Sequence, residues 1–396
     1  MSYIEKLLQG VEVEWKTLEQ VAIKISSGGT PNTGTSSYYN GNIPWLRTQE
    51  VGYGDIWDTE IKITELGLNN SSAKLIPENC VIVAMYGATV GKVGINKIPL
   101  STNQACANIQ LNEEISHYRY VYHFLLSQYE YIKSLGAGSQ TNINAQIIKK
   151  LQIPVPPLEI QKEIVRILDK FTDLTAELTA DLTAELTARK KQYNYYREQL
   201  LSFEDREVEW KTLGDVGEVR MCRRILKEQT NDDGGIPFYK IGTFGKEPNA
   251  FITKNLFVEY KSKYSYPKIG EVLISASGTI GRTVIFNGED AYFQDSNIVW
   301  IENDERQALN KYLFYFYQIA KWEISGGGTI QRLYNDNLKK TIIPIPSLEE
   351  QSRIVSILDK FDTLTTSISE GLPKEIELRK KQYEYYRDLL LTFPKK

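Results

Sequence analysis

The sequence predicts a mixed α/β protein in which two globular domains are separated by two long antiparallel helices that form a coiled-coil rod. Three observations support this fold class. Blocks of the chain recur about 190 residues later, the longest blocks carry heptad-spaced apolar residues, and the segments between them contain short β-branched runs and Gly-rich turns. The duplication also predicts that a pseudo-two-fold axis relates the two halves.

The duplication divides the chain into variable and conserved parts. Residues 153–171 match 343–361, 189–197 match 379–387, and 12–18 match 207–213. The first two pairs are both offset by 190 positions and the third by 195. We therefore expect variable domains at 1–152 and 204–342, and conserved helical segments at 153–203 and 343–396.

The first conserved segment predicts one long helix. After Pro157, apolar residues from Ile160 to Leu178 follow the 4-3-4-3-4 spacing of a coiled coil. The predicted helix is about 45 residues, or about 65 Å, long. In the second copy, Gly371 and Pro373 predict a break, or a restart with proline in the first helical turn.

Tandem Thr-Ala-acid-Leu tetrads occupy the middle of this first helix. Their leucines interrupt the heptads with a spacing of four, which locally unwinds a supercoil. They align with the apolar residues of the second copy from Leu364 to Ile376. We therefore predict a spacer that sets the distance and rotation between the flanking domains, rather than a repetitive surface helix. The spacer leucines are Leu174, Leu178, Leu182 and Leu186.

Two predicted strands, at 79–86 and 271–276, and two predicted helices, near 118–133 and 310–322, indicate α/β folding in the variable domains. The chain has 396 residues, three cysteines and two histidines, and no apolar run approaches the length of a membrane span. Without a signal peptide, this composition favours a reducing cytoplasm and disfavours zinc or histidine-based catalysis. The net charge of −3 disfavours DNA binding through bulk charge, but not through local patches.

The segment Gly87-Ala-Thr-Val-Gly-Lys92 resembles a phosphate-binding loop but fails its spacing. Only three residues separate the glycines, and Val93 follows the lysine where Ser or Thr is needed. An Asn-Pro-Pro-aromatic methyltransferase motif is also missing from the sequence. We therefore expect no catalytic, metal or cofactor site in the chain itself.

The remaining function is recognition, because both halves place hydroxyl, amide and cationic side chains in equivalent loops. The turn 88–92 corresponds to 278–282, and the segment 43–47 corresponds to 236–240, each keeping a cation. Different polar side chains on a shared frame suit the reading of two different base sequences, although turn glycines and solvated cations are an equally good explanation. The candidate DNA-binding residues are Thr30, Asn32, Arg47, Thr89, Lys92, Gln104, Gln140, Arg223, Arg224, Lys240, Thr279, Arg282, Gln294, Gln331 and Arg332.

The blocks Ile-Pro-x-Pro…Glu-x-Gln…Ile-Leu-Asp-Lys-Phe and Arg-Lys-Lys-Gln-Tyr, with the tetrads, resemble the specificity (S) subunit of type I restriction–modification enzymes. The resemblance covers essentially the whole chain and is closest to the subgroup with Thr-Ala-Glu-Leu spacers. It implies two target recognition domains that each read half of a bipartite, asymmetric site in double-stranded DNA. It also implies that the helices dock two methyltransferase (M) subunits, and that the tetrad number relates to the length of the unspecified spacer.

The same resemblance assigns the chemistry to partner subunits in the cytoplasm. The M subunits carry S-adenosylmethionine and methylate adenine, and restriction (R) subunits use ATP and Mg²⁺ to cleave unmodified DNA. Two alternatives are a coiled-coil scaffold without a DNA role and a fused enzyme that cuts or methylates alone. A scaffold does not explain the divergent loops, and a fused enzyme needs motifs that the sequence lacks.

Overall fold

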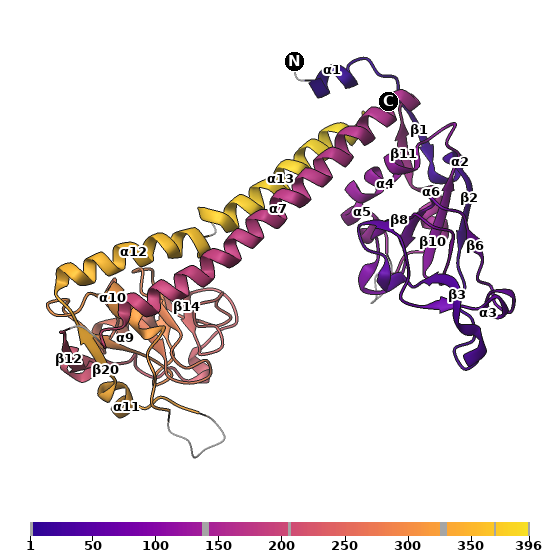
Figure 1. Ribbon diagram of the computed structural model, residues 1–396. Helices are drawn as coiled ribbons and strands as arrows, with labels where there is room; N and C mark the ends of the chain where they lie inside the picture. The colour runs from indigo at the N-terminus through magenta and orange to yellow at the C-terminus, as the bar shows by residue number, and fades with distance from the viewer. Residues whose placement is uncertain (1–2, 137–141, 205–206, 325–330, 368–369, 395–396) are drawn as a thin grey trace. The chain divides into compact units, whose positions relative to one another are not determined.

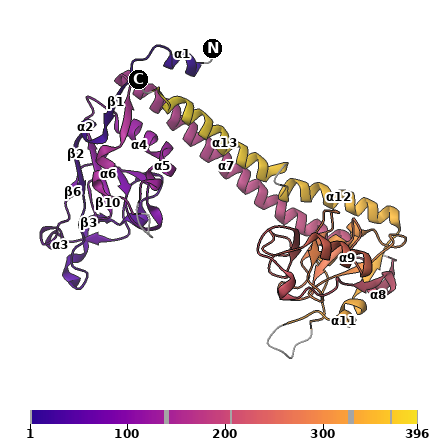
Figure 2. The same cartoon turned by 180° about the vertical axis from the view of Figure 1, so that it is seen from behind.

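The computed structural model describes residues 3–136, 142–204, 207–324, 331–367 and 370–394. They form two compact units. Unit 1 comprises Met1–Asp181 and Ile376–Lys396, and unit 2 comprises Leu182–Glu375. Each unit contains one α/β domain and part of the long helices (Figures 1 and 2). None of the helices within the described ranges is long and apolar enough to cross a membrane.

Unit 1 is built from short strands and helices. Its strands are β1 (Glu14–Thr17), β2 (Ala22–Ser27), β3 (Tyr39–Leu46), β4 (Gly54–Ile56), β5 (Lys62–Ile63), β6 (Leu75–Ile76), β7 (Val81–Ala84), β8 (Val93–Asn96), β9 (Leu100–Thr102), β10 (Cys106–Leu111) and β11 (Gln152–Val155). Its helices are α1 (Tyr3–Leu8), α2 (Leu18–Val21), α3 (Glu65–Asn69), α4 (Tyr118–Ser127), α5 (Tyr129–Ser134) and α6 (Ala145–Lys150), with 3-10 turns at Ser36–Tyr38, Thr48–Glu50 and Gly87–Thr89.

The strands of unit 1 form three sheets. The largest has the order β2-β10-β7-β8-β4, a second has the order β5-β3-β9-β6, and β1 pairs with β11 in an antiparallel ladder of its own. Helix α4 packs on β7 and β8. The alternating short turns and strands follow from local signals such as the capping box at Thr17, whose side chain and that of Gln20 cap each other's backbone amides at the start of α2.

Unit 2 has a similar set of elements. Its strands are β12 (Glu209–Thr212), β13 (Glu218–Arg220), β14 (Ile236–Tyr239), β15 (Phe251–Ile252), β16 (Val272–Ser275), β17 (Thr283–Ile285), β18 (Tyr292–Phe293), β19 (Ile298–Glu302) and β20 (Ile342–Ile345). Its shorter helices are α8 (Leu213–Val216), α9 (Lys254–Lys263), α10 (Asn310–Tyr317) and α11 (Asn335–Lys340), with a 3-10 turn at Lys227–Gln229. The sheets have the orders β13-β19-β16-β17, β15-β14-β18 and β12-β20.

Three long helices complete the two units. Helix α7 (Leu158–Leu201) has 44 residues and begins directly after Pro157, as the heptad spacing predicts. Helices α12 (Leu348–Thr366) and α13 (Gly371–Leu391) are separate, and Pro373 lies in the first turn of α13. This confirms the predicted restart, because proline lacks the N–H that a helix interior needs but is tolerated in the first turn.

Aromatic side chains connect the long helices within each unit. In unit 1, Phe171 of α7 stacks on Tyr386 of α13 with ring centroids 5.3 Å apart, and Thr172 donates to the Tyr383 hydroxyl at 3.2 Å. Moving along α7 from Phe171 to Thr172, the contacting residue of α13 moves backward from Tyr386 to Tyr383. These two segments therefore run antiparallel. In unit 2, Tyr196 of α7 stacks on Phe361 of α12 at 5.5 Å. In each unit, α7 therefore packs against a second long helix through aromatic side chains.

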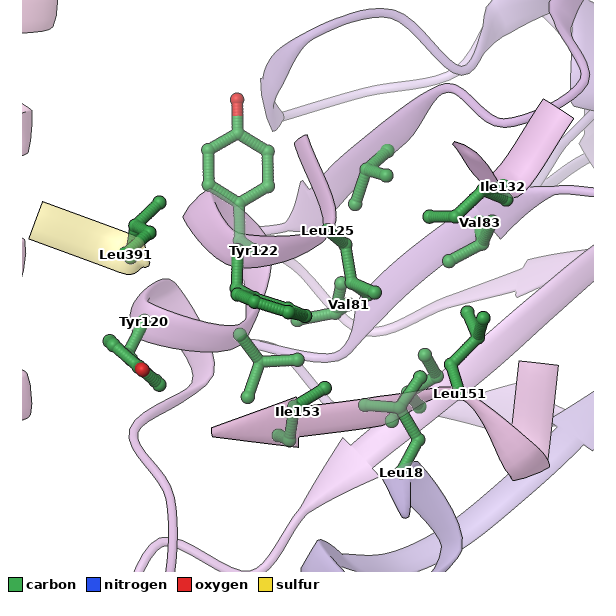
Figure 3. Close-up of a cluster of buried hydrophobic side chains, with 14 of the residues drawn as sticks. Leu18, Val81, Val83, Tyr120, Tyr122, Leu125, Ile132, Leu151, Ile153 and Leu391 are labelled. Carbon is green, nitrogen blue, oxygen red and sulfur yellow. The ribbon is translucent and has the colours of Figure 1, made fainter. Parts of the chain in front are cut away.

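The core of unit 1 joins the sheet, helix α4 and the end of α13. Figure 3 shows Leu391 of α13 beside Tyr120 and Tyr122, next to Val81 of β7 and Ile153 of β11. All five side chains are buried. The last turn of α13 is therefore part of the hydrophobic core of this domain.

A buried glutamine fastens each domain to its long helix. Gln161 of α7 accepts from the amide of His117 at 2.9 Å and from Ser116, and donates to the carbonyls of Ile115 and Pro156. Gln351 of α12 likewise bonds Leu309, Gln307 and Pro346 at 2.7–2.8 Å. Both glutamines are fully buried. They satisfy backbone groups of the loop that precedes α4 in unit 1 and α10 in unit 2, from side chains that are themselves buried.

An aspartate of the repeated Leu-Asp-Lys-Phe sequence supplies a second connection in each unit. Asp169 accepts two hydrogen bonds from Arg119 and lies 2.7 Å from His123 Nε2. Asp359 accepts from Lys311 at 2.7 Å and from the hydroxyl of Tyr315. Burial raises the pKa of Asp169, but its bonds to His123 and Arg119 outweigh this effect and leave that pKa below the ordinary value.

The structure confirms the predicted strands as β7 and β16, divides the helical stretch predicted near 118–133 into two helices, and shortens the helix predicted near 310–322. The segment 118–133 bends at Gln128 into α4 and α5, and the helix predicted for 310–322 ends at Tyr317. The following aromatic residue explains both endings. The Tyr129 ring lies 3.3 Å from where a Cβ on Gly91 would be, and Trp322 overlaps the corresponding position on Gly281. Tertiary packing against these turn glycines overrides helix propensity.

Candidate nucleic-acid interface

The ends of two parallel strands bring several predicted residues of unit 1 together. Strands β3 and β9 pair in parallel, with Leu46 opposite Thr102, and Arg47 and Gln104 follow just beyond their ends. The Thr102 carbonyl also accepts the amide of Gly29 at 2.9 Å, and the Thr30 hydroxyl donates to Gln104. Thr30 and Gln104 therefore form one polar cluster at this edge, although 74 positions separate them in the sequence.

Arg47 is held by carboxylates at the same edge. Its Nε donates to Glu50 at 2.9 Å and its Nη2 pairs with Glu60, leaving 21% of the side chain exposed. The hydrogen bond that Arg47 donates to Glu50 raises the pKa of Arg47, and burial partly opposes this effect. Glu50 and Glu60 thus neutralise much of the charge that this guanidinium could offer to a phosphate. In the free protein Arg47 therefore orders the loop that follows β3.

The glycine turn after β7 lies against that loop. The Thr89 hydroxyl donates to the Thr48 carbonyl at 2.9 Å, and the Lys92 ammonium lies 5.4 Å from the centre of the Tyr53 ring. Gly87 and Gly91 have φ angles of 76° and 83°. Positive φ favours glycine, so the turn requires these residues for its shape. Lys92 remains partly exposed and can offer a charge to a ligand.

Unit 2 presents a matching edge with different side chains. Strands β14 and β18 pair in parallel, with Tyr239 opposite Phe293, and Lys240 follows as an exposed cation. Alignment of the two repeats at an offset of 190 pairs Gln104 with Gln294, but the strand register corrects this equivalence. The amides of Asn103 and Gln294 donate to the carbonyls of Leu46 and Tyr239 respectively, both at 2.9 Å, so Gln294 corresponds to Asn103 and not to Gln104. The side chain of Gln294 accepts the Ile241 amide at 2.9 Å.

The turn after β16 in unit 2 is fastened by its own arginine. Arg282 donates to the Phe244 carbonyl at 3.0 Å, and its other Nη lies 3.5 Å from the Thr279 hydroxyl. Arg332 donates to the Ser296 carbonyl at 2.7 Å. It also forms a strand-like bridge with Ser277, directly before the turn. Thr279, Arg282, Gln294 and Arg332 therefore surround one edge of the unit.

The other candidates lie on exposed loops. Asn32 accepts the amide of Gly34 at 2.9 Å, and Gln331 is exposed. Arg223 and Arg224 follow β13, and the Arg223 guanidinium lies 5.3 Å from the centre of the Tyr264 ring. The segments with Thr30 and Arg223 both follow the first strand of the main sheet, β2 or β13. Gln140 lies outside the described residues.

The prediction missed the aromatic partners of these cations. Tyr53, Tyr264 and Tyr334 are 55%, 43% and 54% exposed, and each lies beside Lys92, Arg223 or Arg332. Exposed aromatic rings beside cations are suited to nucleic acids, because rings stack on bases while cations bind phosphates. Separations of about 40 positions conceal the Lys92–Tyr53 and Arg223–Tyr264 pairs in the sequence, whereas Tyr334 lies two positions after Arg332.

The cysteines are buried and chemically inert. Burial raises the pKa of Cys80, Cys106 and Cys222 to about 12, so all three thiols are protonated at neutral pH. Among the residues with described positions, no group of three or more His, Cys, Asp or Glu side chains is arranged to hold a metal ion.

Comparison with known proteins identifies one family. The sequence profile of the type I restriction modification DNA specificity domain matches residues 10–188 and again residues 206–378. A chain from Haemophilus influenzae, assigned as a type I restriction enzyme specificity subunit, is 52% identical and aligns over 99% of this chain and 98% of its own length. The specificity subunit of the Escherichia coli enzyme EcoR124I/EcoR124II is 34% identical, with 100% and 98% coverage.

Solved structures share the fold at low sequence identity. A chain from a study of complex assembly and conformational transition of the type I R-M system aligns with a TM-score of 0.70 at 18% identity, covering 96% of this chain and 97% of the other. The HsdS subunit from Thermoanaerobacter tengcongensis gives 0.58 at 17% identity, with 96% and 95% coverage. Both resemblances concern the fold alone.

Proposed function

This chain belongs to the family of type I restriction modification DNA specificity proteins, and from that premise we propose that it reads a bipartite, asymmetric DNA site. It is the specificity subunit of a type I restriction–modification system. In the proposal, the α/β domain of unit 1 contacts one half-site and that of unit 2 contacts the other. The complex acts in the cytoplasm, where it meets double-stranded DNA.

One observation carries the proposal: the two units present different side chains on equivalent strand ends. Arg47 in unit 1 is held by two carboxylates, whereas Lys240, after the equivalent strand of unit 2, is exposed. Thr30 bonds Gln104 in the first unit, and Arg223 lies over Tyr264 in the second. Different hydrogen-bonding groups on one frame can read different bases, because each base pair has its own donor and acceptor pattern in the major groove.

The proposal assigns catalysis to other subunits. Two methyltransferase subunits bind S-adenosylmethionine and methylate adenine, and restriction subunits cleave unmodified DNA with ATP and Mg²⁺. The two long helical segments form an antiparallel rod that docks the methyltransferases. Because the chain has a net charge of −3, partners supply much of the positive charge that binds phosphates.

We further propose that the Thr-Ala-acid-Leu tetrads set the length of the unspecified spacer between half-sites. Four residues advance an α-helix by about 6 Å. Leu174 is 47% exposed and the other three tetrad leucines are half-buried, so removing one tetrad deletes little of either domain core. Deletion of Thr179–Leu182 is expected to shorten the spacer and to leave both half-sites unchanged. Mapping of methylated sites in cells measures both properties, and an unchanged spacer would refute this role.

Binding experiments test the complete proposal. The purified chain, alone and with its methyltransferase, is tested for a sequence-dependent DNA mobility shift and for methyl transfer. We expect sequence-dependent binding by the assembled complex and methyl transfer only when the methyltransferase is present. Methyl transfer by the isolated chain would contradict the assignment of catalysis to the partners. Absence of DNA binding under both conditions would favour a coiled-coil scaffold instead.

A further inference from the structure

Each unit contains a pocket where the last turn of a long helix meets the α/β domain. In unit 1 the pocket has a volume of about 600 Å³. Phe124 of α4 and Leu391 and Phe393 at the end of α13 form its floor, while Trp15 of β1 and Lys150 of α6 lie at its rim. Figure 3 shows Leu391 at the edge of the core that this floor continues.

The pocket of unit 2 has a volume of about 420 Å³ and the same five residue types. Phe316, Leu201 and Phe203 take the place of the floor residues, and Trp210 and Lys340 take the place of the rim residues.

The hydrogen bonds of each unit show that these positions correspond. Trp15 lies opposite Pro154 in the β1–β11 ladder, and Trp210 lies opposite Pro344 in the β12–β20 ladder. The hydroxyl of Tyr120 donates to the Pro154 carbonyl at 3.0 Å, and that of Tyr312 donates to the Pro344 carbonyl at 2.9 Å. The floor phenylalanines follow these tyrosines by four positions, on the same helix face.

The lysines also correspond, because each ends the short helix that precedes the ladder strand. The residue after Lys150 accepts the amide of Leu18 through its carbonyl, and the residue after Lys340 accepts that of Leu213, both at 2.9 Å. All five pairs are therefore structurally equivalent as well as identical in residue type.

Packing explains the floor residues but not the rim. Leu391, Phe393, Leu201 and Phe203 are at most 9% exposed, so each domain core requires apolar side chains there. At the rim, Trp210 is 51% exposed and both lysines are exposed. Over the ranges that the structure describes, neither lysine has an ion-pair partner. Trp15 is half-buried and donates its indole N–H to the Pro394 carbonyl at 3.3 Å, so its own domain accounts for part of its placement. Neither domain core needs an exposed lysine without an ion-pair partner, and these lysines carry the argument.

Neighbouring positions of the two pockets have diverged, which makes the shared rim more informative. Tyr131 and Gln128 line the first pocket, whereas Glu323 and Ala320 line the second. Retention of the tryptophan and lysine amid such changes indicates one requirement common to both units. A partner that is present in two identical copies imposes such a requirement.

DNA does not suit these pockets. In both views of the molecule, β1 and β11 lie beside the C-terminus, whereas β3, which leads to Arg47, lies toward the other end of the same domain (Figures 1 and 2). The pocket of unit 1, which Trp15 of β1 borders, therefore lies apart from the β3 end of the domain, where Arg47 follows the strand. A floor of Phe and Leu side chains with a cation at the rim complements an apolar side chain next to a carboxylate.

We propose that the two pockets receive the same segment of two identical methyltransferase subunits, an apolar side chain flanked by an acidic residue. The inference rests on the proposed function, because that function supplies a partner in two copies. Each apolar side chain fills a floor of Phe and Leu, and each carboxylate pairs with Lys150 or Lys340. The pockets thus add a contact inside each α/β domain to the docking of the methyltransferases on the long helices.

Charge reversal tests this inference on the full-length chain with its purified methyltransferase. Native mass spectrometry counts the methyltransferase subunits on the wild type and on K150E, K340E and the double variant. We expect two copies on the wild type, one on each single variant and none on the double variant at concentrations that saturate the wild type. Each reversed charge is expected to weaken its site by about a hundredfold or more, because it sets a like charge against the carboxylate of the partner.

Matched controls separate this inference from the proposed function. K74E and K254E reverse exposed lysines outside the pockets, and they are expected to bind two copies. K150R keeps the charge and is also expected to bind two copies, and thermal unfolding verifies that every variant is folded. Two copies on the folded double variant would overturn the pocket assignment and leave the proposed function intact. Failure of the wild type to bind any methyltransferase would instead overturn both.

Discussion

Units 1 and 2 agree where the α/β domain meets a long helix and differ where the sheets end in loops. At the helix, Gln161 and Gln351 bond backbone groups of equivalent loops, and Tyr120 and Tyr312 bond equivalent proline carbonyls. At the strand ends, exposed cations in one unit occur where the other has carboxylate-bound or uncharged groups. The comparison separates residues that hold a domain in place from residues that are free to change what the domain contacts.

The aspartate connection is intermediate between these two extremes. Asp169 and Asp359 are identical, but Arg119 and His123 in unit 1 are replaced by Lys311 and Tyr315 in unit 2. The helix side of the connection is thus constant, whereas its domain side varies. Each variable domain must therefore supply hydrogen-bond donors to the aspartate of its long helix.

The largest expected effect comes from removal of the buried glutamines. Q161L removes the partner of the buried Pro156 carbonyl and of the partly buried His117 amide and Ile115 carbonyl, since leucine fills the space but forms no hydrogen bonds. We expect each of Q161L and Q351L to destabilise its own unit by about 3 kcal/mol. Hydrogen exchange resolved along the chain measures the effect separately in the two units.

Q199L serves as the control for this pair, because Gln199 is an exposed residue of α7. We expect it to change the unfolding free energy by less than about 0.5 kcal/mol. Faster exchange in unit 2 caused by Q161L, to the same extent as in unit 1, would show that the two units do not carry independent connections.

A smaller effect is expected from the aspartates. D169N removes the charge that Arg119 and His123 bind and is expected to cost about 2 kcal/mol. D359N is expected to cost about 1 kcal/mol, because its partner Lys311 is 51% exposed and water screens that pair. Denaturant unfolding of the two variants ranks the connections, and an equal loss in both would contradict the ranking.

Acid is expected to reduce the stability difference between wild type and D169N. The bonds from His123 and Arg119 depress the pKa of Asp169 in the folded protein despite burial. A depressed carboxyl pKa stabilises the fold fully above the unfolded value, about 3.9, and this contribution is lost as the pH falls through the folded value. The difference in unfolding free energy between wild type and D169N should therefore shrink below about pH 4.

Local sequence signals predicted the long helices well. The heptad spacing located α7, and Pro373 located the start of α13, because both effects act within a few residues along the chain. The break between α4 and α5 and the end of α10 were not predicted. Tyr129, the first residue of α5, packs on Gly91, and Trp322, beyond the end of α10, packs on Gly281. Such contacts depend on segments about 40 residues away, which periodicity does not reveal.

The candidate site was predictable only in part for the same reason. Sequence spacing identified loops with polar residues, and the structure brings Thr30 to Gln104 and Thr279 to Arg282. Sequence spacing could not show that Arg47 is bound by Glu50 and Glu60. The shift of Gln294 from the position of Gln104 to that of Asn103 also depends on the strand register, which a constant sequence offset does not record.

The smallest expected effect is on DNA affinity, and it compares the strand-end edges of the two units that are proposed to contact DNA. Arg224 of unit 2 is exposed, whereas the corresponding segment of unit 1, residues 28–32, carries no charged side chain. R224A is expected to weaken binding of the assembled complex to its DNA by about threefold and to reduce the slope of log affinity against log salt by about one. It should not alter the bases recognised, because a phosphate contact carries no sequence information.

R306A is the matched control, since the Arg306 side chain is 84% exposed in the same unit and pairs with Asp304 outside the strand ends. Titration of both variants at several salt concentrations compares one arginine at the proposed edge with one elsewhere. Equal changes in slope would mean that only total charge matters. A change for R224A alone would place the edge of unit 2 against the phosphates, and the unlike charges of the two edges would then give the half-sites unequal salt dependence.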